Sequence, residues 1–310
     1  LAAHHLVVDG VSWRVLLPDL AAAYRGDELD PVPTSFRSWA RGLAAEATSQ
    51  ARLDELPLWT RMLAGPQAIL GSRPVDPARD TVAAGTRRTD LTLPAAETSA
   101  LLTDAPEALL SDAPEALLSD APEAFGAGVD DLLLAGLMAA VEEWRRARGL
   151  RTPGGQLVDV ESHGRAGGDL GRTVGWCTAE YPVRLDAGGL DHADVRAGGP
   201  AAARLVAHVA GRLRDVPGDG LGFGLLRHLN PDTAPVLAAL PRAQIGFNYL
   251  GRFTAASGRT PPGTAASGAW RLAGEDALSG APDPRMAAVH ALDASGVVRD
   301  GADGPRGPSR

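Results

Sequence analysis

The chain has 310 residues, a formal net charge of −8 and a pI near 5.4, which argues against nucleic-acid binding. A single cysteine, Cys177, excludes a disulfide framework and a cysteine-based metal site. With no apolar run of about 18 residues and no charged-then-apolar leader, we expect a soluble, cytoplasmic protein without membrane partners.

The first part of the chain is predicted to be helical. Apolar residues recur at helical spacing over residues 11–24, with Ser12 as the expected N-cap. A second helix should begin at Ser35 or one residue earlier, and a third should cover residues 56–63. Residues 64–88 lose periodicity and gain Gly, Pro and Asp, which predicts a linker. Four tryptophans on apolar helical faces are expected in the core: Trp13, Trp39, Trp59 and Trp144.

Strands and helices alternate in the rest of the chain. The expected strands are 88–93, 156–160, 181–185, 243–250 and 290–298. One expected helix begins at Pro94, and two others cover residues 129–144 and 200–213. This alternation predicts an α/β fold.

Residues 101–124 contain three near-identical octads, LLTDAPEA followed by two copies of LLSDAPEA. Eight residues are too few for a solenoid unit, and the proline in each copy interrupts a continuous helix. We interpret the array as a tandem duplication that forms a surface excursion. A functional binding repeat is the alternative.

The string HHLVVDG at residues 4–10 combines two histidines, a carboxylate and a glycine within seven residues. Histidine can exchange a proton near neutral pH, and either His4 or His5 could have this role. Asp9 could orient an imidazole ring or its loop, and Gly10 permits close approach of backbone or substrate. On a strand the two histidines would point to opposite faces, so we expect them to have different roles.

Four later motifs also combine polar residues with glycine: VESHGR (160–165), GRTVGWCTAEYPV (171–183), GFGLLRHLN (222–230) and IGFNYLG (245–251). Together with HHLVVDGVSWRVLL, and in this order, they resemble the epimerization domains of non-ribosomal peptide synthetases. The resemblance covers essentially the whole chain. HHxxxDG alone occurs throughout the condensation superfamily, whereas FGLLRHLN and FNYLG are far more specific to epimerization domains.

The resemblance implies a chloramphenicol-acetyltransferase-like fold of two lobes with a tunnel between them. It assigns residues 1–75 to the N-terminal lobe, 76–87 to an inter-lobe linker and 88–310 to the C-terminal lobe, with the octads as an insertion. Family members have a long segment before HHxxxDG, so we expect an N-terminal truncation that removes most of that lobe.

A carrier-bound substrate is also implied. It would be an aminoacyl or peptidyl thioester on the 4′-phosphopantetheine of a peptidyl carrier protein domain, and neighbouring synthetase modules would be further partners. The domain itself is expected to bind no cofactor, because a thioester acidifies the α-carbon enough for a side-chain base.

The resemblance also assigns catalytic residues. His5 and Glu161 match the positions expected to handle the α-proton on opposite faces. Tyr249, with Asn248 beside it, matches a family pair that could donate a hydrogen bond to the enolate oxygen. A core role for Tyr249 is an equal alternative.

Five other motif residues are expected to support the site. His4 would pack or orient the loop, and Asp9 would be an orienting carboxylate bonded to backbone or arginine. Gly10 completes the first motif, while His163 and Arg165 would support the second loop. Departures from the family pattern lie at Ser162, Ala166 and Cys177, where a glycine, an acidic residue and an aromatic residue are common.

Two other functions remain open from the sequence. A condensation domain would use the same histidine to assist amide formation between two carrier-bound substrates. An inactive remnant would serve only as a docking module. The sequence does not identify the residue that would be epimerised.

Overall fold

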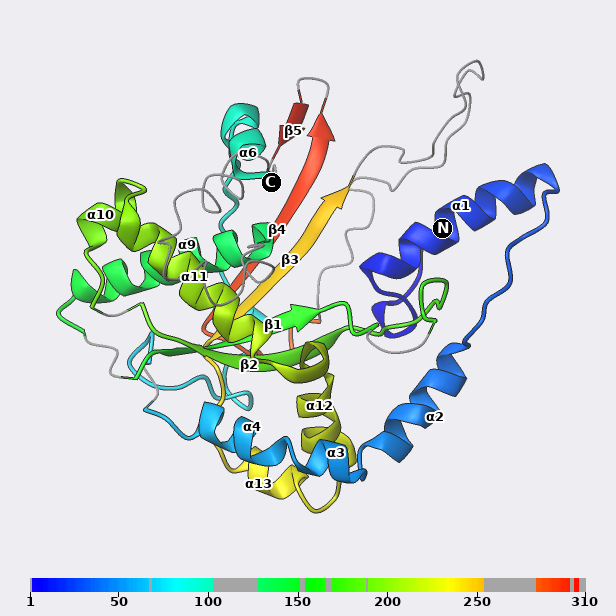
Figure 1. Ribbon diagram of the computed structural model, residues 1–310, viewed down its shortest axis with the longest axis horizontal. Helices are drawn as coiled ribbons and strands as arrows, with labels where there is room; N and C mark the ends of the chain where they lie inside the picture. The colour runs from blue at the N-terminus through cyan, green and yellow to red at the C-terminus, as the bar shows by residue number, and fades with distance from the viewer. Residues whose placement is uncertain are drawn as a thin grey trace, which may run out of the picture.

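The computed structural model contains one mixed β-sheet flanked by helices (Figure 1). In the part of the chain that it describes, five strands follow the order β2-β1-β3-β4-β5. They are β1 (Gln156–Ser162), β2 (Ala179–Leu185), β3 (Ile245–Phe253), β4 (Leu292–Gly301) and β5 (Gly304–Arg306). The described residues are 2–66, 69–102, 128–150, 154–165, 169–187, 189–253, 283–301 and 304–306.

Most of the helices lie on the two sides of this sheet or extend from it (Figure 1). The helices in the first part of the chain are α1 (Gly10–Arg25), α2 (Phe36–Glu46), α3 (Gln50–Leu53), α4 (Leu56–Leu63), α5 (Val82–Gly85) and α6 (Ala95–Leu102), preceded by the 3₁₀ turn η1 (His5–Val7). The later ones are α9 (Val129–Arg146), α10 (His192–Arg196), α11 (Pro200–Arg214), η2 (Pro217–Gly220), α12 (Leu221–Gly224), the π-helical turn η3 (Leu225–Leu229) and α13 (Ala234–Ala238).

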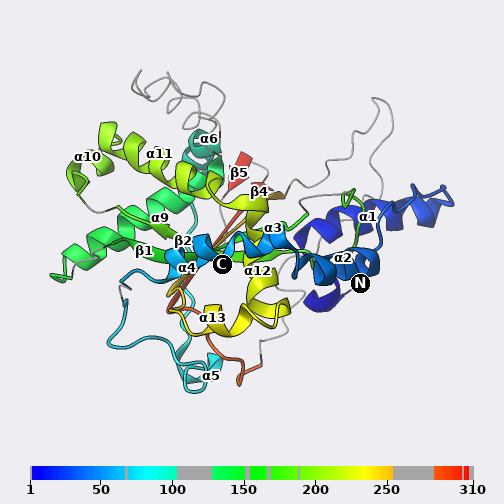
Figure 2. The ribbon, with the colours of Figure 1, turned by 60° about the horizontal axis from the view of Figure 1, so that its bottom comes forward.

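The sheet has one apolar face and one polar face. β1 pairs antiparallel with β2 and parallel with β3, and β3 pairs parallel with β4, so residues in register share a face. The row Val158, Val183 and Ile245 is fully buried. Figure 2 shows α9 and α11 on one side of β1 and β2, with α4 and α13 on the other.

The other face carries polar side chains where α4 no longer covers it. Asp159 and Glu161 alternate with the buried valines of β1. Glu180 lies opposite Glu161, and Asp293 and Ser295 follow on β4 in the same rows. Because alternate residues of a strand point to opposite faces, these polar groups gather over the central strands.

The structure confirms the predicted α/β class and most of the predicted elements, with two corrections. Asp9, not Ser12, caps α1: its carboxylate accepts from the Ser12 amide at 2.8 Å, and the Ser12 hydroxyl accepts from the Asp9 amide. Residues 88–93 do not form a strand. They are irregular and exposed, because among the described residues no strand pairs with them, and alternation alone does not supply a partner.

The tryptophan prediction is correct only for Trp59, which is fully buried with the α4 residues Met62 and Leu63. Trp13 and Trp39 are half-buried. Trp144 is 37% exposed, and the Arg148 guanidinium lies 4.3 Å from its ring centroid.

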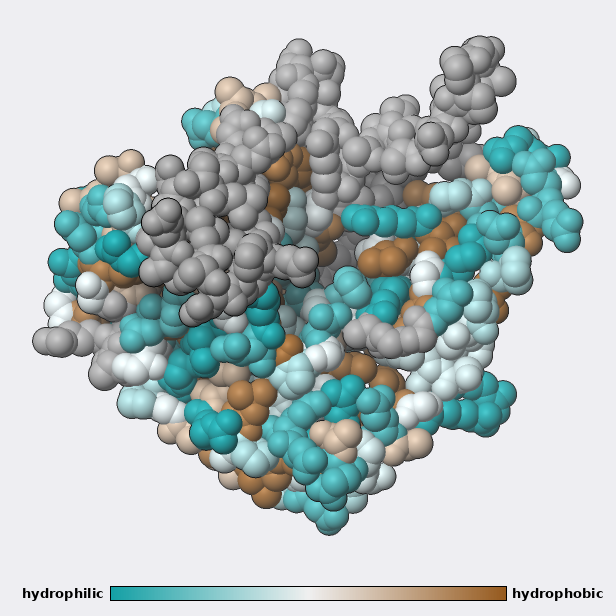
Figure 3. Space-filling model, in the orientation of Figure 1, coloured by the Kyte–Doolittle hydropathy of each residue, from teal (hydrophilic) through white to brown (hydrophobic). Residues whose placement is uncertain are grey.

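Two further findings concern the surface and the octads. Large apolar side chains are exposed in η1 and α1, and brown areas beside α1 mark apolar surface in Figure 3. Among the described helices, none has both the length and the apolar character to cross a membrane. Nearly all of the octad array, from residue 103 onward, lies outside the described residues.

Candidate active site

An open pocket lies on the polar face of the sheet. Its side chains come from three central strands, the edge strand β2 and the segment before β4. The polar residues that line it are Asp159, Glu161, Glu180, Asn248, His290, Asp293 and Ser295. The site predicted around Glu161 is therefore far more acidic than the motifs suggest.

Glu161 lies near the end of β1, where its carboxylate accepts a hydrogen bond of 2.6 Å from the Asn248 side-chain amide. Desolvation raises the pKa of Glu161, and the charge of Asp293 acts in the same direction. The charges of His5 and His290 and the Asn248 bond work to lower this pKa, which nevertheless stays raised overall. A carboxyl with a raised pKa is suited to take up and return a proton.

His5 belongs to a 3₁₀ turn and not to a strand, so the argument that His4 and His5 alternate across a sheet is wrong. The His5 ring is exposed and lies 4.9 Å from the ring of Trp176. Its charge acts on Glu161. His4 bonds locally, because its Nδ1 accepts from the Leu6 amide at 3.1 Å.

Asp9 and Arg165 form a buried ion pair that joins the first motif to the second. Arg165 donates to the two Asp9 carboxylate oxygens at 2.7 and 2.9 Å, and the side chains of Arg165 and Asp9 are 7% and 3% exposed. The amides of Ser12 and Cys177 donate to the same carboxylate. Burial works to raise the pKa of Asp9, but Arg165 and these donors lower it overall. The Arg165 amide donates to His163 Nδ1 at 3.0 Å.

Two motif glycines differ in what the structure requires of them. Gly164 has φ +63°, and a Cβ there would lie 1.7 Å from the Cys177 carbonyl oxygen, so only glycine fits. Gly10 is the first residue of α1, and a Cβ there would meet no atom within 4 Å. Packing therefore gives a reason for Gly164 and none for Gly10.

The structure separates Asn248 from Tyr249. Asn248 bonds Glu161 on the pocket face, and the next residue of the strand points to the other face. Tyr249 packs against the main core, on the side where Leu133 of α9 lies. The structure thus joins Asn248 to Glu161, with the charge of His5 acting on that carboxyl, and places Tyr249 on the other face of β3.

Asn230, the last residue of the GFGLLRHLN motif, forms hydrogen bonds with backbone groups of two segments. Asn230 is buried, and its amide donates to the Ala47 carbonyl at 2.8 Å. Its side-chain oxygen accepts from the amides of Asp232 and Thr233. These bonds fasten the end of α2 to the turn before α13.

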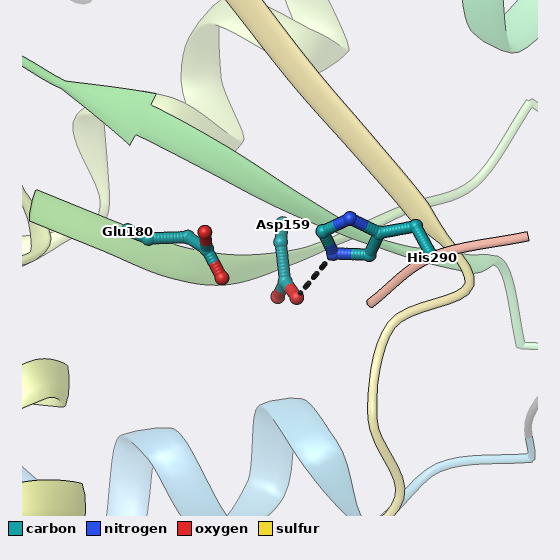
Figure 4. A group of neighbouring side chains, drawn as sticks. All are labelled: Asp159, Glu180 and His290. Atoms are coloured by element: carbon teal, nitrogen blue, oxygen red, sulfur yellow. Dashed lines mark hydrogen bonds and ion pairs between the residues drawn. The ribbon is translucent and has the colours of Figure 1, made fainter. Parts of the chain in front are cut away.

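Four charged pocket residues lie outside the sites expected from the sequence: Asp159, Glu180, His290 and Asp293. Nδ1 of His290 lies 2.7 Å from Asp293. Its Nε2 lies 2.9 Å from Asp159, the contact drawn in Figure 4. Burial works to lower the pKa of His290, but the bonds and charges of the two carboxylates raise it to about 10. The spacing of two acids on one strand, Asp159 and Glu161, is the signal in the sequence that points to this cluster.

Asp159, Glu180 and His290 also meet the distance criterion for a metal site, since their ligand atoms lie within 4.8 Å of one another. A metal needs a free lone pair on the imidazole. Both ring nitrogens of His290 already face carboxylate oxygens, at 2.7 and 2.9 Å. The group fits an ion-pair network better than a metal centre.

Ser162, where related motifs have glycine, is tied to a strained turn. Its hydroxyl donates to the Asp219 carbonyl at 2.8 Å, and Asp219 has φ +54°. We expect Ser162→Ala to lower the free energy of unfolding by about 0.5–1.5 kcal/mol in urea titrations, because one hydrogen bond is lost. Ser162→Gly should lose about 0.5–1 kcal/mol more through backbone entropy. A Ser162→Ala protein as stable as the parent would contradict this.

Comparison with known proteins gives a consistent set of relatives. The family model described as "Condensation domain" matches residues 1–267. A linear gramicidin synthase of Brevibacillus parabrevis is 36% identical over 265 residues, which cover 82% of this chain and 3% of that protein. Surfactin synthase subunit 2 of Bacillus subtilis is 33% identical, over 82% of this chain and 6% of that protein. The chain thus matches a small part of each curated relative.

Solved structures support the same fold. The epimerization domain from the third module of tyrocidine synthetase B superposes with a TM-score of 0.65 and 28% identity, over 98% of this chain and 61% of that one. The first condensation domain of the CDA synthetase gives a TM-score of 0.52 at 19% identity, over 98% and 55%. The latter similarity concerns the fold alone.

Proposed function

Because the chain belongs to the condensation-domain family, we propose that it epimerises, from L to D, the α-carbon of an aminoacyl or peptidyl thioester on a carrier protein domain. The observation that carries this proposal is the environment of Glu161. Its carboxylate lies in an open pocket, bonded to Asn248 and under the charge of His5. The 28% identity to a solved epimerization domain supports the same reaction.

The chemistry needs two proton-handling groups and no oxidant. A base removes the α-proton, and the C–H electron pair moves toward the thioester carbonyl to give an enolate. Return of a proton to the opposite face re-forms the C–H bond with inverted configuration. Glu161 serves one face and His5 the other, and each contributes on the order of 10²- to 10⁴-fold to the rate. Asn248 holds the Glu161 carboxylate, and Tyr249, which packs against the core on the other face of β3, has no part in the proposed reaction.

The proposal includes the partners that this substrate requires. The thioester is carried on the 4′-phosphopantetheine of a peptidyl carrier protein domain, and neighbouring synthetase modules deliver and accept the peptide in the cytoplasm. The relatives belong to peptide synthetases, which supports this setting.

Peptide-bond formation is the second candidate, and the family model's description favours it. A condensation domain would use His5 to assist attack of an acceptor amine on the donor thioester. It would not need Glu161, which lines the pocket on the polar face and bonds Asn248 there.

An assay with an α-deuterated aminoacyl-carrier separates the two reactions. We expect loss of the deuterium to solvent and a mixture of D and L amino acid after hydrolysis of the thioester. A parallel sample adds an aminoacyl acceptor on a second carrier and is analysed for dipeptide. Retained deuterium together with dipeptide would replace epimerization by condensation, and neither product would support a docking role.

A further inference from the structure

One imidazole lies among four carboxylates on the polar face of the sheet. His290 is 7% exposed and bridges Asp159 and Asp293. Figure 4 shows its ring beside Asp159, with Glu180 beyond. Nothing in the sequence motifs points to this residue. Resting on the proposed function, we propose that His290 is a positioning residue, an imidazolium whose charge keeps Glu161 ionised as a base.

Negative side chains outnumber positive ones around His290. Asp159 and Glu161 face it from β1, Glu180 from β2 and Asp293 from β4. Among the described residues, Arg227 of η3 also interacts with this cluster of carboxylates, because the charge of Asp159 acts on its guanidinium. Carboxylates that line the same pocket repel one another, and this repulsion disfavours the ionised form of each. The pKa of Glu180 shows the effect, since burial and then the charges of Asp159 and Glu161 raise it, against His290.

His290 is held in its charged form by geometry. An imidazole that donates from both nitrogens must carry two protons. Its Nδ1 and Nε2 each face a carboxylate oxygen within 2.9 Å. With a pKa of about 10 it remains charged at pH values where carboxyl groups titrate. It therefore supplies a constant positive charge and does not act as a pH switch.

This charge has a defined effect on Glu161. His290 and His5 lower the pKa of Glu161, while Asp293 raises it. A neutral side chain at position 290 should therefore raise the pKa of Glu161, and a neutral side chain at position 293 should lower it. A role in folding alone would not give shifts of opposite sign.

The test compares His290→Gln with Asp293→Asn. Glutamine at position 290 can still hydrogen-bond Asp159. The Asp293→Asn variant should fold, because the side chain that it changes is 65% exposed. The acidic limb of the pH profile for α-deuterium washout should move up by on the order of one pH unit in His290→Gln. It should move down in Asp293→Asn.

A second readout does not depend on turnover. The pKa of Glu161 is measured by carboxyl ¹³C NMR titration of the substrate-free chain, with Glu161→Gln to assign the signal. The same opposite shifts are expected. Unchanged or parallel shifts in the two variants would overturn the inference. If the two variants showed the opposite shifts but the parent chain gave no washout at any pH, the proposed function would fail while the electrostatic role of His290 stood.

Discussion

Replacement of Glu161 by glutamine is expected to slow α-deuterium washout by about 10²- to 10⁴-fold for one epimer of the substrate. Glutamine keeps the size of the side chain and can still bond Asn248, but it cannot take up the proton. The other epimer presents its α-hydrogen to His5 and should still exchange. His5→Ala should give the reverse preference.

The measurement is washout from separately prepared L- and D-aminoacyl carriers, read by mass spectrometry before either epimer accumulates. Glu28→Gln is a suitable control, because Glu28 is exposed beyond the far end of α1. Equal losses for both epimers in one variant would indicate a single base acting on both faces. Parental exchange in both Glu161→Gln and His5→Ala would remove the two residues from the mechanism.

The second large effect concerns Arg165. Replacement by alanine should lower the free energy of unfolding by about 3–5 kcal/mol, because the Asp9 carboxylate stays buried without its partner. Urea titrations of parent and variant give this difference. Arg285→Ala is the matched control: Arg285 pairs with Asp283 at the surface, its side chain is 89% exposed, and little change is expected.

The effect of Arg165 should depend on pH in one direction. The pKa of Asp9 is lowered in the folded chain, since Arg165 and the amide donors outweigh its burial. Its stabilisation is then present above the unfolded-state pKa of about 3.9 and is lost as the pH falls through the lower native value. The difference between parent and Arg165→Ala should begin to shrink below about pH 4 and should vanish only below the native pKa of Asp9. A constant difference down to acid pH would assign the effect to packing instead.

The elements could be predicted from the sequence better than the site could. Helices and strands with clear periodicity, such as those at residues 129–144 and 156–160, are predicted correctly because the pattern is local. The charged pocket is missed because it depends on register. β1, β3 and β4 start at residues 156, 245 and 292, and only their pairing places Asp159 in line with Asp293.

The same limit explains one wrong segment and one pair of residues whose roles the sequence left open. Alternation over residues 88–93 looks like a strand, but a strand requires a neighbour, which the local pattern does not contain. Tyr249 and Asn248 are adjacent in a motif, and only the direction of β3 shows which of them faces Glu161. His5 and Glu161 are predicted together because motif order, and not local structure, carries the information.

The bond between Asp9 and Arg165 also has a consequence for synthesis of the chain. Its two halves are 156 residues apart in sequence. At translation rates of about 5–20 residues per second, Arg165 follows Asp9 by roughly 8–31 s. Throughout that interval the Asp9 carboxylate lacks its guanidinium partner, and the apolar turn beside it, with Leu6 64% exposed even in the finished fold, is free to make other contacts. The segment around Asp9 is therefore a place where chaperone binding or misfolding should concentrate during synthesis.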